Sequence, residues 1–150
     1  MNRIIKFRAW DKKEKVMINS FAHVGNEGRM FTIHHGQPEN EYEVMQFTGL
    51  LDRNSVEICE GDIVGVPYIN PMGGVDDKYD PNTVYPVVFE HGQFSLKRPY
   101  FNQPLIDWLK KETGEYIPNY GNRKIVTGEF IGEVIGNIYM NPELEEASNE

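Results

Sequence analysis

The sequence predicts a mainly β fold: a small β-barrel or curved sheet with an N-terminal hairpin and one short α-helix near residues 103–112. Three observations support this class. Short apolar clusters alternate with turn residues over 44–66, apolar and polar residues alternate over 3–10, and glycines recur at every fourth position near the end of the chain. Alternation and turn-bounded apolar runs are typical of half-buried strands.

The composition indicates one globular domain. A chain of 150 residues with 39% hydrophobic and 25% charged residues can bury roughly two thirds of its unfolded surface without a metal or disulfide. We expect a single domain over 1–142 and an acidic, frayed tail over 143–150. Cys59 has no disulfide partner in the chain, and no apolar run approaches the roughly 18 residues of a membrane span. We therefore expect a cytoplasmic protein without a membrane partner.

The first strand is expected at 3–10, where Lys6, Arg8 and Trp10 share one face. A turn at 11–14 and a second strand at 16–18 complete a hairpin. Through Val16 the chain has six basic and two acidic residues, a balance of +4, so the remainder carries −12 of the total of −8. A basic head on an acidic body favours association between copies of the chain.

The stretch 44–66 is expected to organise the fold as strand, turn, short strand, turn and strand. Its last turn contains Gly61 and Asp62, to which we assign a structural role, because glycine and aspartate are common in tight turns. A further strand is expected at 30–33. The segment 67–86 contains four prolines and two adjacent glycines, and it predicts a long mobile loop.

Residues 87–96 predict the clearest hairpin, with Gly92 at a position that requires a positive φ. The helix at 103–112 is expected because Asn102 can cap it, Pro104 suits its first turn and an apolar stripe follows. The segment 112–124 is left without a predicted conformation beyond a loop at 116–123.

The last ordered segment, 125–139, carries Gly128, Gly132 and Gly136. An even spacing puts these glycines on one face of an unbulged strand, where glycine marks a bend, a bulge or a close backbone approach. We expect a strongly curved final strand, or a hairpin turning near Gly132. A structural role is assigned to all three glycines.

Three stretches resemble one family. Residues 5–11 read Ile-Lys-Phe-Arg-Ala-Trp-Asp, 44–66 is the organising stretch, and 133–139 read Glu-Val-Ile-Gly-Asn-Ile-Tyr, followed at 141–144 by Asn-Pro-Glu-Leu. In this order they resemble the YopX family of phage and prophage proteins. The resemblance implies a mainly β, barrel-containing fold, oligomeric assembly and a viral or prophage origin. It brings no catalytic residues.

The chain departs from the family pattern at two positions. Ser55 stands where the family tends to have glycine after Asp-x-Asn, and Cys59 stands where an aromatic residue is usual. Serine tolerates a positive φ poorly, so a type I′ turn at 54–55 is disfavoured.

Candidate chemistry is sparse. Glu57, Glu60 and Asp62 could bind a divalent ion, but a solvated turn between strands needs the same residues. Lys6, Arg8 and Trp10 could contact nucleic acid or a protein partner, because cations beside an aromatic can follow a phosphate backbone and stack a base. The charged outer face of an edge strand explains these three equally well.

The leading functional hypothesis is a non-catalytic, self-associating phage accessory protein whose β-barrel is an interaction module. No catalytic residues, metal site or cofactor are assigned, and the expected partners are a second copy and an unidentified protein. One alternative is a nucleic-acid-binding module that uses the basic and aromatic N-terminal strand. The other is a metal-assisted hydrolase.

Overall fold

The computed structural model describes residues 4–19, 23–24, 30–31, 42–69, 75–76, 83–118 and 121–148. The contacts divide the chain into two compact units, Met1–Gly49 and Leu50–Glu150. The sequence predicted one domain over 1–142, and the division falls within that range. The two units are described in turn.

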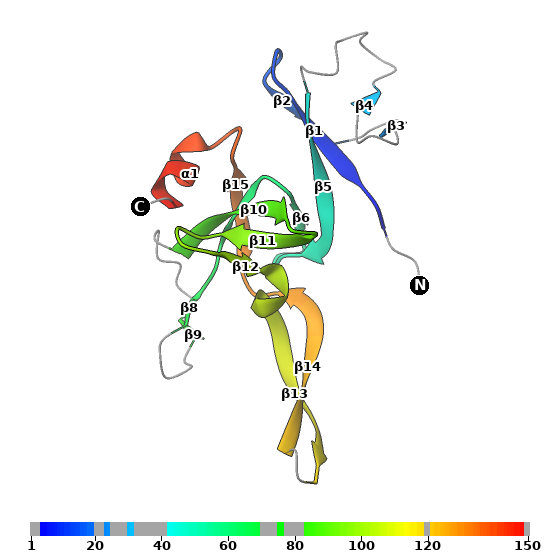
Figure 1. The fold of residues 1–150 in the computed structure, drawn as a ribbon, viewed down its shortest axis with the longest axis vertical. Coiled ribbons are helices and arrows are strands. Elements are labelled where there is room, and N and C mark those ends of the chain that lie inside the picture. Colours follow the sequence, from blue (N-terminus) through cyan, green and yellow to red (C-terminus); the bar gives the residue numbers. More distant parts are fainter. Residues whose placement is uncertain are drawn as a thin grey trace. The chain divides into compact units, whose positions relative to one another are not determined.

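The first unit contains the predicted N-terminal hairpin. Strands β1 (Phe7–Asp11) and β2 (Val16–Ile18) are antiparallel, and β5 (Tyr42–Leu51) pairs along the other side of β1 (Figure 1). Ala9 is fully buried and forms a small core with Tyr42. The hairpin prediction is confirmed.

A buried aspartate shapes the turn of this hairpin. Asp11 Oδ1 accepts hydrogen bonds from the backbone N–H groups of Lys13 and Glu14, both at 2.9 Å. Lys15 then adopts a φ of 54°. A short polar side chain that bonds its own backbone in this way holds the chain in a turn instead of a continued strand.

The other pair described in this unit is short. Strand β3 (His23–Val24) is antiparallel to β4 (Met30–Phe31). The strand predicted at 30–33 is therefore present at its first two residues, and the rest of that range lies outside the described residues.

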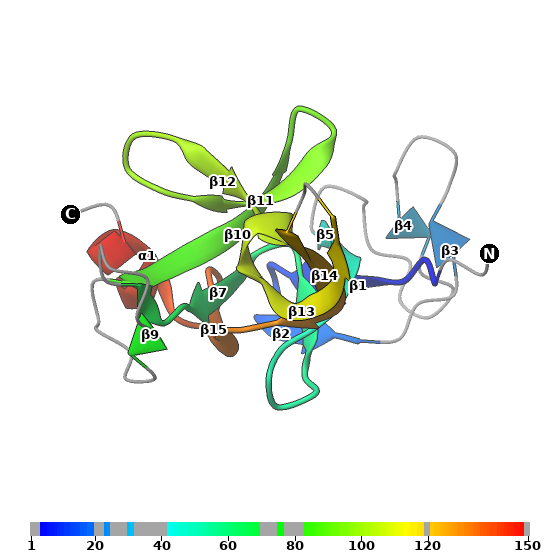
Figure 2. The ribbon, with the colours of Figure 1, turned by 90° about the horizontal axis from the view of Figure 1, so that it is seen from below.

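The second unit is built on a five-stranded antiparallel sheet. Its order is β12-β11-β10-β7-β15, and the sheet is curved (Figures 1 and 2). Its strands are β7 (Asp62–Gly65), β10 (Val84–Glu90), β11 (Gln93–Lys97), β12 (Asn102–Pro104) and β15 (Glu133–Asn137). The mainly β class with a curved sheet is confirmed. The β10–β11 hairpin is also confirmed, because Gly92 has a φ of 79° in its turn.

The core of the second unit lies against this sheet. Strand β6 (Glu57–Cys59) contributes Ile58 to it. The buried members of the core come from six elements and from Val66, which follows β7: Ile58, Val64, Val66, Tyr85, Val87, Leu96, Leu105, Trp108 and Phe130. Phe130 is the largest side chain with no exposed surface.

The α-helix predicted at 103–112 is wrong. The segment is divided among β12, the 3₁₀-helix η3 (Leu105–Trp108) and β13 (Leu109–Ile117). Leu105 and Trp108 are buried three residues apart, which matches the repeat of a 3₁₀ turn, and Leu109 is already extended with a ψ of 140°. The apolar stripe was only one turn long, and strand pairing beyond it overrides the helical pattern.

Strand β13 pairs with β14 (Gly121–Phe130) as a two-stranded ribbon that follows η3 (Figure 1). The loop predicted at 116–123 is therefore too long, because β13 continues to Ile117 and β14 begins at Gly121. The pairing contains register shifts, which a sequence pattern does not reveal.

Two further expectations are corrected. The segment 67–86 contains a strand pair, β8 (Tyr68–Ile69) with β9 (Val75–Asp76), and β10 already begins at Val84. The tail is not frayed through its whole length, because α1 (Pro142–Ser148) forms there and lies against β10. Proline at the first helical position and acidic residues in the first turn both favour this helix.

The final segment is neither one curved strand nor a hairpin. Strand β14 ends at Phe130 and pairs with β13, whereas β15 begins at Glu133 and pairs with β7. Gly132 lies at the break where the chain passes from one sheet to the other.

Candidate functional site

Lys6, Arg8 and Trp10, the predicted contact residues, occupy alternate positions in and just before β1, the strand that pairs with β5. Arg8 and Trp10 are in β1, opposite Met45 and Glu43 of β5. Lys6 precedes β1, and its carbonyl accepts a hydrogen bond from Phe47 N–H at 2.8 Å. The Lys6 ammonium lies 5.5 Å from the centre of the Phe47 ring.

This face of the first unit is not an open row of cations. Cross-strand partners share a face, and Met45 opposite Arg8 is buried. Glu43 opposite Trp10 pairs with Lys12 at 2.8 Å. Lys6 is exposed, whereas Arg8 and Trp10 are half-buried. A nucleic-acid phosphate at Trp10 would therefore meet a carboxylate as well as cations.

Gly61 and Asp62 form the turn between β6 and β7. Gly61 has a φ of 81°, its N–H donates to Val87 O, and its carbonyl accepts from Ile138 N–H, both at 2.9 Å. Asp62 is buried, and its Oδ2 accepts from Cys59 N–H at 2.7 Å. The turn thus connects β10 to the residue that follows β15.

The candidate metal ligands do not form a cluster. Within the described residues, no group of three histidine, cysteine, aspartate or glutamate side chains could hold a metal ion, and Glu57, Glu60 and Asp62 are all described. Asp62 is engaged in its turn, and Glu57 is exposed. The geometry therefore offers no support for a metal-assisted hydrolase at these residues.

The three glycines of the last segment have different surroundings. Gly132 is buried, and a Cβ there would overlap the Gly65 carbonyl oxygen and lie 2.7 Å from the Phe130 ring. A Cβ at Gly136 would meet the Asn141 side-chain oxygen at 2.5 Å. Gly128 lies in β14, and its surroundings are outside the described part of the structure. Close backbone approach is thus found at Gly132.

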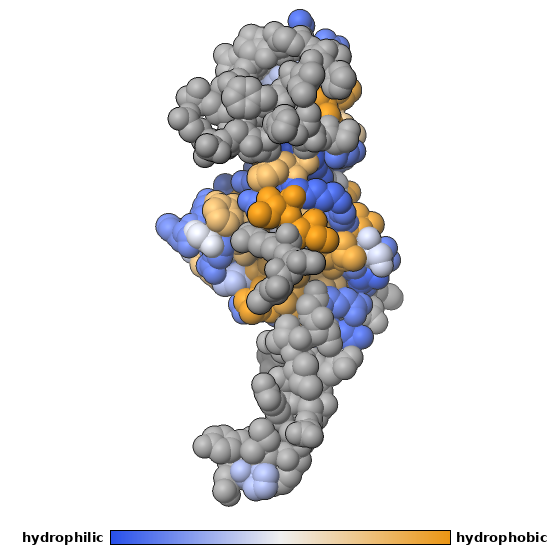
Figure 3. Space-filling view, turned by 90° about the vertical axis from the view of Figure 1, so that its right-hand side faces the viewer, coloured by the Kyte–Doolittle hydropathy of each residue, from blue (hydrophilic) through white to orange (hydrophobic). Residues whose placement is uncertain are grey.

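Apolar side chains are exposed at both ends of β12, the edge strand of the five-stranded sheet. Tyr100 is 96% exposed and Phe101 is exposed before the strand, and Ile106 is exposed after it. We call these three residues with β12 the β12 edge. Figure 3 shows one face of the molecule, on which hydrophobic patches reach the surface between hydrophilic ones.

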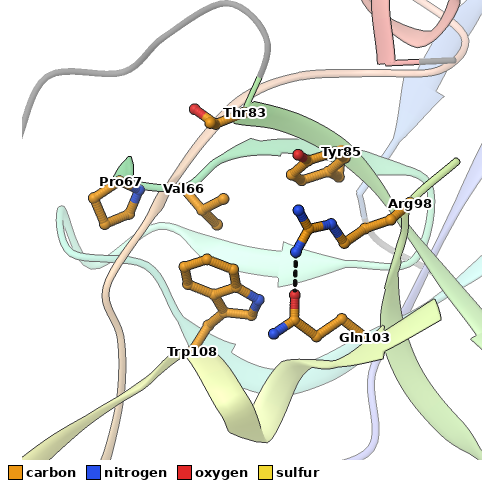
Figure 4. Close-up of a pocket in the computed structure, with 7 residues that line it drawn as sticks. All are labelled: Val66, Pro67, Thr83, Tyr85, Arg98, Gln103 and Trp108. Carbon is orange, nitrogen blue, oxygen red and sulfur yellow. Dashed lines mark hydrogen bonds between the residues drawn. The ribbon is translucent and has the colours of Figure 1, made fainter. Parts of the chain in front are cut away.

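A pocket of about 270 Å³ opens in the second unit (Figure 4). It is lined from β10, β12 and η3, from the residue before β10 and from the residues that follow β7 and β11: Val66, Pro67, Thr83, Tyr85, Arg98, Gln103 and Trp108. Arg98 donates from one guanidinium nitrogen to Gln103 Oε1 at 2.9 Å. The Arg98 guanidinium carbon lies 5.0 Å from the centre of the Tyr85 ring and 5.2 Å from that of Phe101.

Sequence reasoning missed this pocket. Its residues come from positions 66 to 108, and Gln103 and Trp108 fell in the segment predicted as a helix. No motif links them, because antiparallel pairing of β7, β10, β11 and β12 brings them together. The local signal is Arg98 itself, a cation between an expected strand and a Pro-Tyr-Phe sequence.

The comparisons with known proteins agree with this fold. The N-terminal hairpin and the curved antiparallel sheet define a mainly β protein. The part of the chain that the structure describes holds no cluster of metal-ligating side chains. The chain belongs to the YopX family, because the family model described as YopX protein matches residues 6–146.

A solved structure of protein EF1440 from Enterococcus faecalis is similar over 96% of this chain and 99% of its own chain, with 26% identity and a TM-score of 0.55. No curated protein matches the chain. Among the described residues, none of the helices has the length and hydrophobicity needed to cross a bilayer.

Proposed function

We propose that this protein is a non-catalytic phage or prophage accessory protein that self-associates and acts as an interaction module. The observation that supports self-association is the β12 edge. Tyr100, an almost fully exposed aromatic residue, and exposed Phe101 precede β12, and Ile106 is exposed after it. Exposed apolar residues along an edge strand are typical of protein interfaces, where aromatic residues are enriched.

The β12 edge favours association through side chains. Strand β12 has three residues, and Pro104 at its end has no N–H to donate to an added strand. Strand addition alone therefore contributes few hydrogen bonds. Tyr100, Phe101 and Ile106 supply the apolar area that a second copy would bury.

The uneven charge supports the same proposal. The basic head of +4 and the remainder of −12 attract each other when they belong to different copies. Salt screens exposed charges over about 8–10 Å at physiological ionic strength. Added salt should therefore weaken the assembly without abolishing it, because apolar burial is not screened.

The test is size-exclusion chromatography with light scattering at low and high salt. The wild-type chain should elute with at least a dimer mass at micromolar concentration. The double variant Tyr100→Ser/Ile106→Ser should elute as a monomer, while the matched control Met140→Ser, which also removes an exposed apolar side chain, should keep the wild-type mass. A strict monomer of the wild-type chain at both salt concentrations would refute self-association.

Nucleic-acid binding through Lys6, Arg8 and Trp10 is the second candidate. It is favoured by the exposed Lys6 ammonium at alternate spacing from Arg8, and disfavoured by Glu43 beside Trp10. Mobility-shift assays at low salt decide it, because phosphate contacts are strongest there. Absence of a shift with single-stranded and double-stranded DNA and RNA would remove this candidate.

A further inference from the structure

We infer that the pocket between Arg98 and Trp108 binds a small monocarboxylate with a compact apolar body. This binding role does not depend on self-association, although the pocket adjoins the β12 edge: Gln103 lies in β12, and the Phe101 ring lies beside Arg98. It is inferred from three features of the described residues: a buried donor for which they supply no acceptor, a cation with no acidic partner among them, and a wall that includes apolar and aromatic side chains.

The unpartnered donor is Trp108 Nε1. Trp108 is buried, with a relative exposure of 7%, and its Nε1 is buried without a hydrogen-bond partner among the residues that the structure describes. Figure 4 shows this nitrogen on the side of the indole ring that faces Gln103 and Arg98. A buried N–H that has no acceptor is unfavourable, so a ligand acceptor at this point would be stabilised.

Arg98 supplies a fixed positive charge. It is half-buried, and its guanidinium lies over the Tyr85 and Phe101 rings. The contacts of Arg98 with other described residues are these rings, Gln103 and the backbone of Phe101, and none of them is acidic. The guanidinium has five N–H donors, and the Gln103 bond uses one nitrogen.

Gln103 adds a further donor. Its Oε1 is occupied by Arg98, which fixes the amide orientation and leaves the NH₂ group on the other side. In Figure 4 this nitrogen points toward Trp108. Arg98 and Gln103 therefore present N–H groups to the pocket, and Trp108 Nε1 lies just beneath its surface on the same side, a set that favours an anion over a cation.

The geometry favours a carboxylate over a phosphate. One guanidinium and two neutral N–H groups can satisfy the two oxygens of a carboxylate, and the Arg–carboxylate pair is commonly bidentate. The remaining wall is formed by Val66, Pro67, the Trp108 and Tyr85 rings and Thr83, and its apolar and aromatic part suits a hydrocarbon or single aromatic ring. The volume of about 270 Å³ is at the lower limit of small-molecule sites, so the ligand is small.

The test follows the Trp108 indole signal in ¹H–¹⁵N spectra of the full chain. The chain has two tryptophans, so Trp10→Phe assigns the remaining indole signal to Trp108. Sodium benzoate should move this signal in a saturable way. Benzamide, which keeps the ring but lacks the charge, and inorganic phosphate, which lacks the apolar body, should each bind at least about tenfold more weakly, a difference of about 1.4 kcal/mol.

Two substitutions locate the benzoate site. Arg98→Gln should weaken benzoate binding at least tenfold, whereas Lys97→Gln, which removes the same charge from the neighbouring exposed residue, should change it less than twofold. Gln103→Glu is the second variant, because a carboxylate beside Arg98 would occupy the cation and should abolish binding without removing any side chain from the pocket.

The proposal is overturned if benzoate at tens of millimolar leaves the Trp108 signal unchanged. It is also overturned if phosphate binds more tightly than benzoate, or if Gln103→Glu binds benzoate as the wild-type chain does. If Arg98→Gln loses its folded spectrum, Gln103→Glu alone decides.

Discussion

Asp52 accepts a hydrogen bond from the backbone N–H of Val134, 82 residues further along the chain, through Oδ2 at 2.9 Å. Its other carboxylate oxygen accepts from Asn54 N–H at 2.8 Å and Val56 N–H at 2.9 Å. The side chain is almost fully buried. One carboxylate thus shapes the turn between β5 and β6 and joins this turn to β15.

The surface of the same turn also contacts β15. Arg53 N–H donates to Gly132 O at 3.1 Å, and Asn54 Nδ2 donates to Glu133 Oε2 at 3.0 Å. Arg53 Nε lies 3.4 Å from the same carboxylate oxygen, at a partly exposed pair. Exposed ion pairs typically contribute less than about 1 kcal/mol, so the buried Asp52 carboxylate dominates this contact.

Asp52→Ala should lower the free energy of unfolding by about 3 kcal/mol or more, because three backbone N–H groups lose their acceptor and each loss costs roughly 1–3 kcal/mol. Urea melts measure the difference. Asp107→Ala, at an exposed aspartate of the same unit, is the control and should be nearly neutral. A loss below about 1 kcal/mol for Asp52→Ala would contradict this role.

Ser55→Gly should stabilise the chain by about 0.5–1 kcal/mol, since Ser55 has a φ of 64° and glycine adopts this conformation without a Cβ clash. Ser55→Ala keeps the Cβ and should bring no such gain. Thermal midpoints of the two variants compare them directly. A lower midpoint for Ser55→Gly than for Ser55→Ala would show that the φ of Ser55 is not a source of strain.

Gly132→Ala should lower the free energy of unfolding by about 1–3 kcal/mol or more, because the new methyl group meets backbone oxygen and a buried ring. Gly136→Ala should cost less, because its contact is the end of the Asn141 side chain, which can move. Urea melts of both variants give the order. Equal midpoints, or a raised midpoint for Gly132→Ala, would contradict the close approach at Gly132.

Two phenylalanines provide a matched test of the core. Phe130→Ala should cost about 3–5 kcal/mol, because Phe130 is completely buried in the core of the second unit. Phe89 is 48% exposed and pairs with Phe94 at a ring separation of 4.9 Å. Phe89→Ala should therefore cost markedly less. Equal losses in chemical denaturation would mean that the core is not centred on Phe130.

Strands were predicted correctly from the sequence where turn-forming residues mark their ends, as in the β1–β2 and β10–β11 hairpins. The hairpins around Asp11 and Gly92 were predictable because aspartate and glycine report turn geometry within a few residues. The positive φ of Ser55 was not expected from its residue type. It arises because Asp52 holds the backbone on both sides of the turn.

The segment around Trp108 could not be predicted from local pattern. Residues 105–109 carry an apolar spacing that suits one turn of helix, but β11 and β14 determine where the chain turns and extends. The register shifts between β13 and β14 have no sequence signature. The pocket depends on this packing, so local sequence pattern does not predict that Arg98 and Trp108 line one cavity.

Sedimentation equilibrium of the unmodified chain tests the central proposal of self-association most directly. The account predicts a weight-average mass that rises with protein concentration through the micromolar range to at least twice the 17.3 kDa of one chain. A mass that stays at 17.3 kDa at every concentration would contradict it.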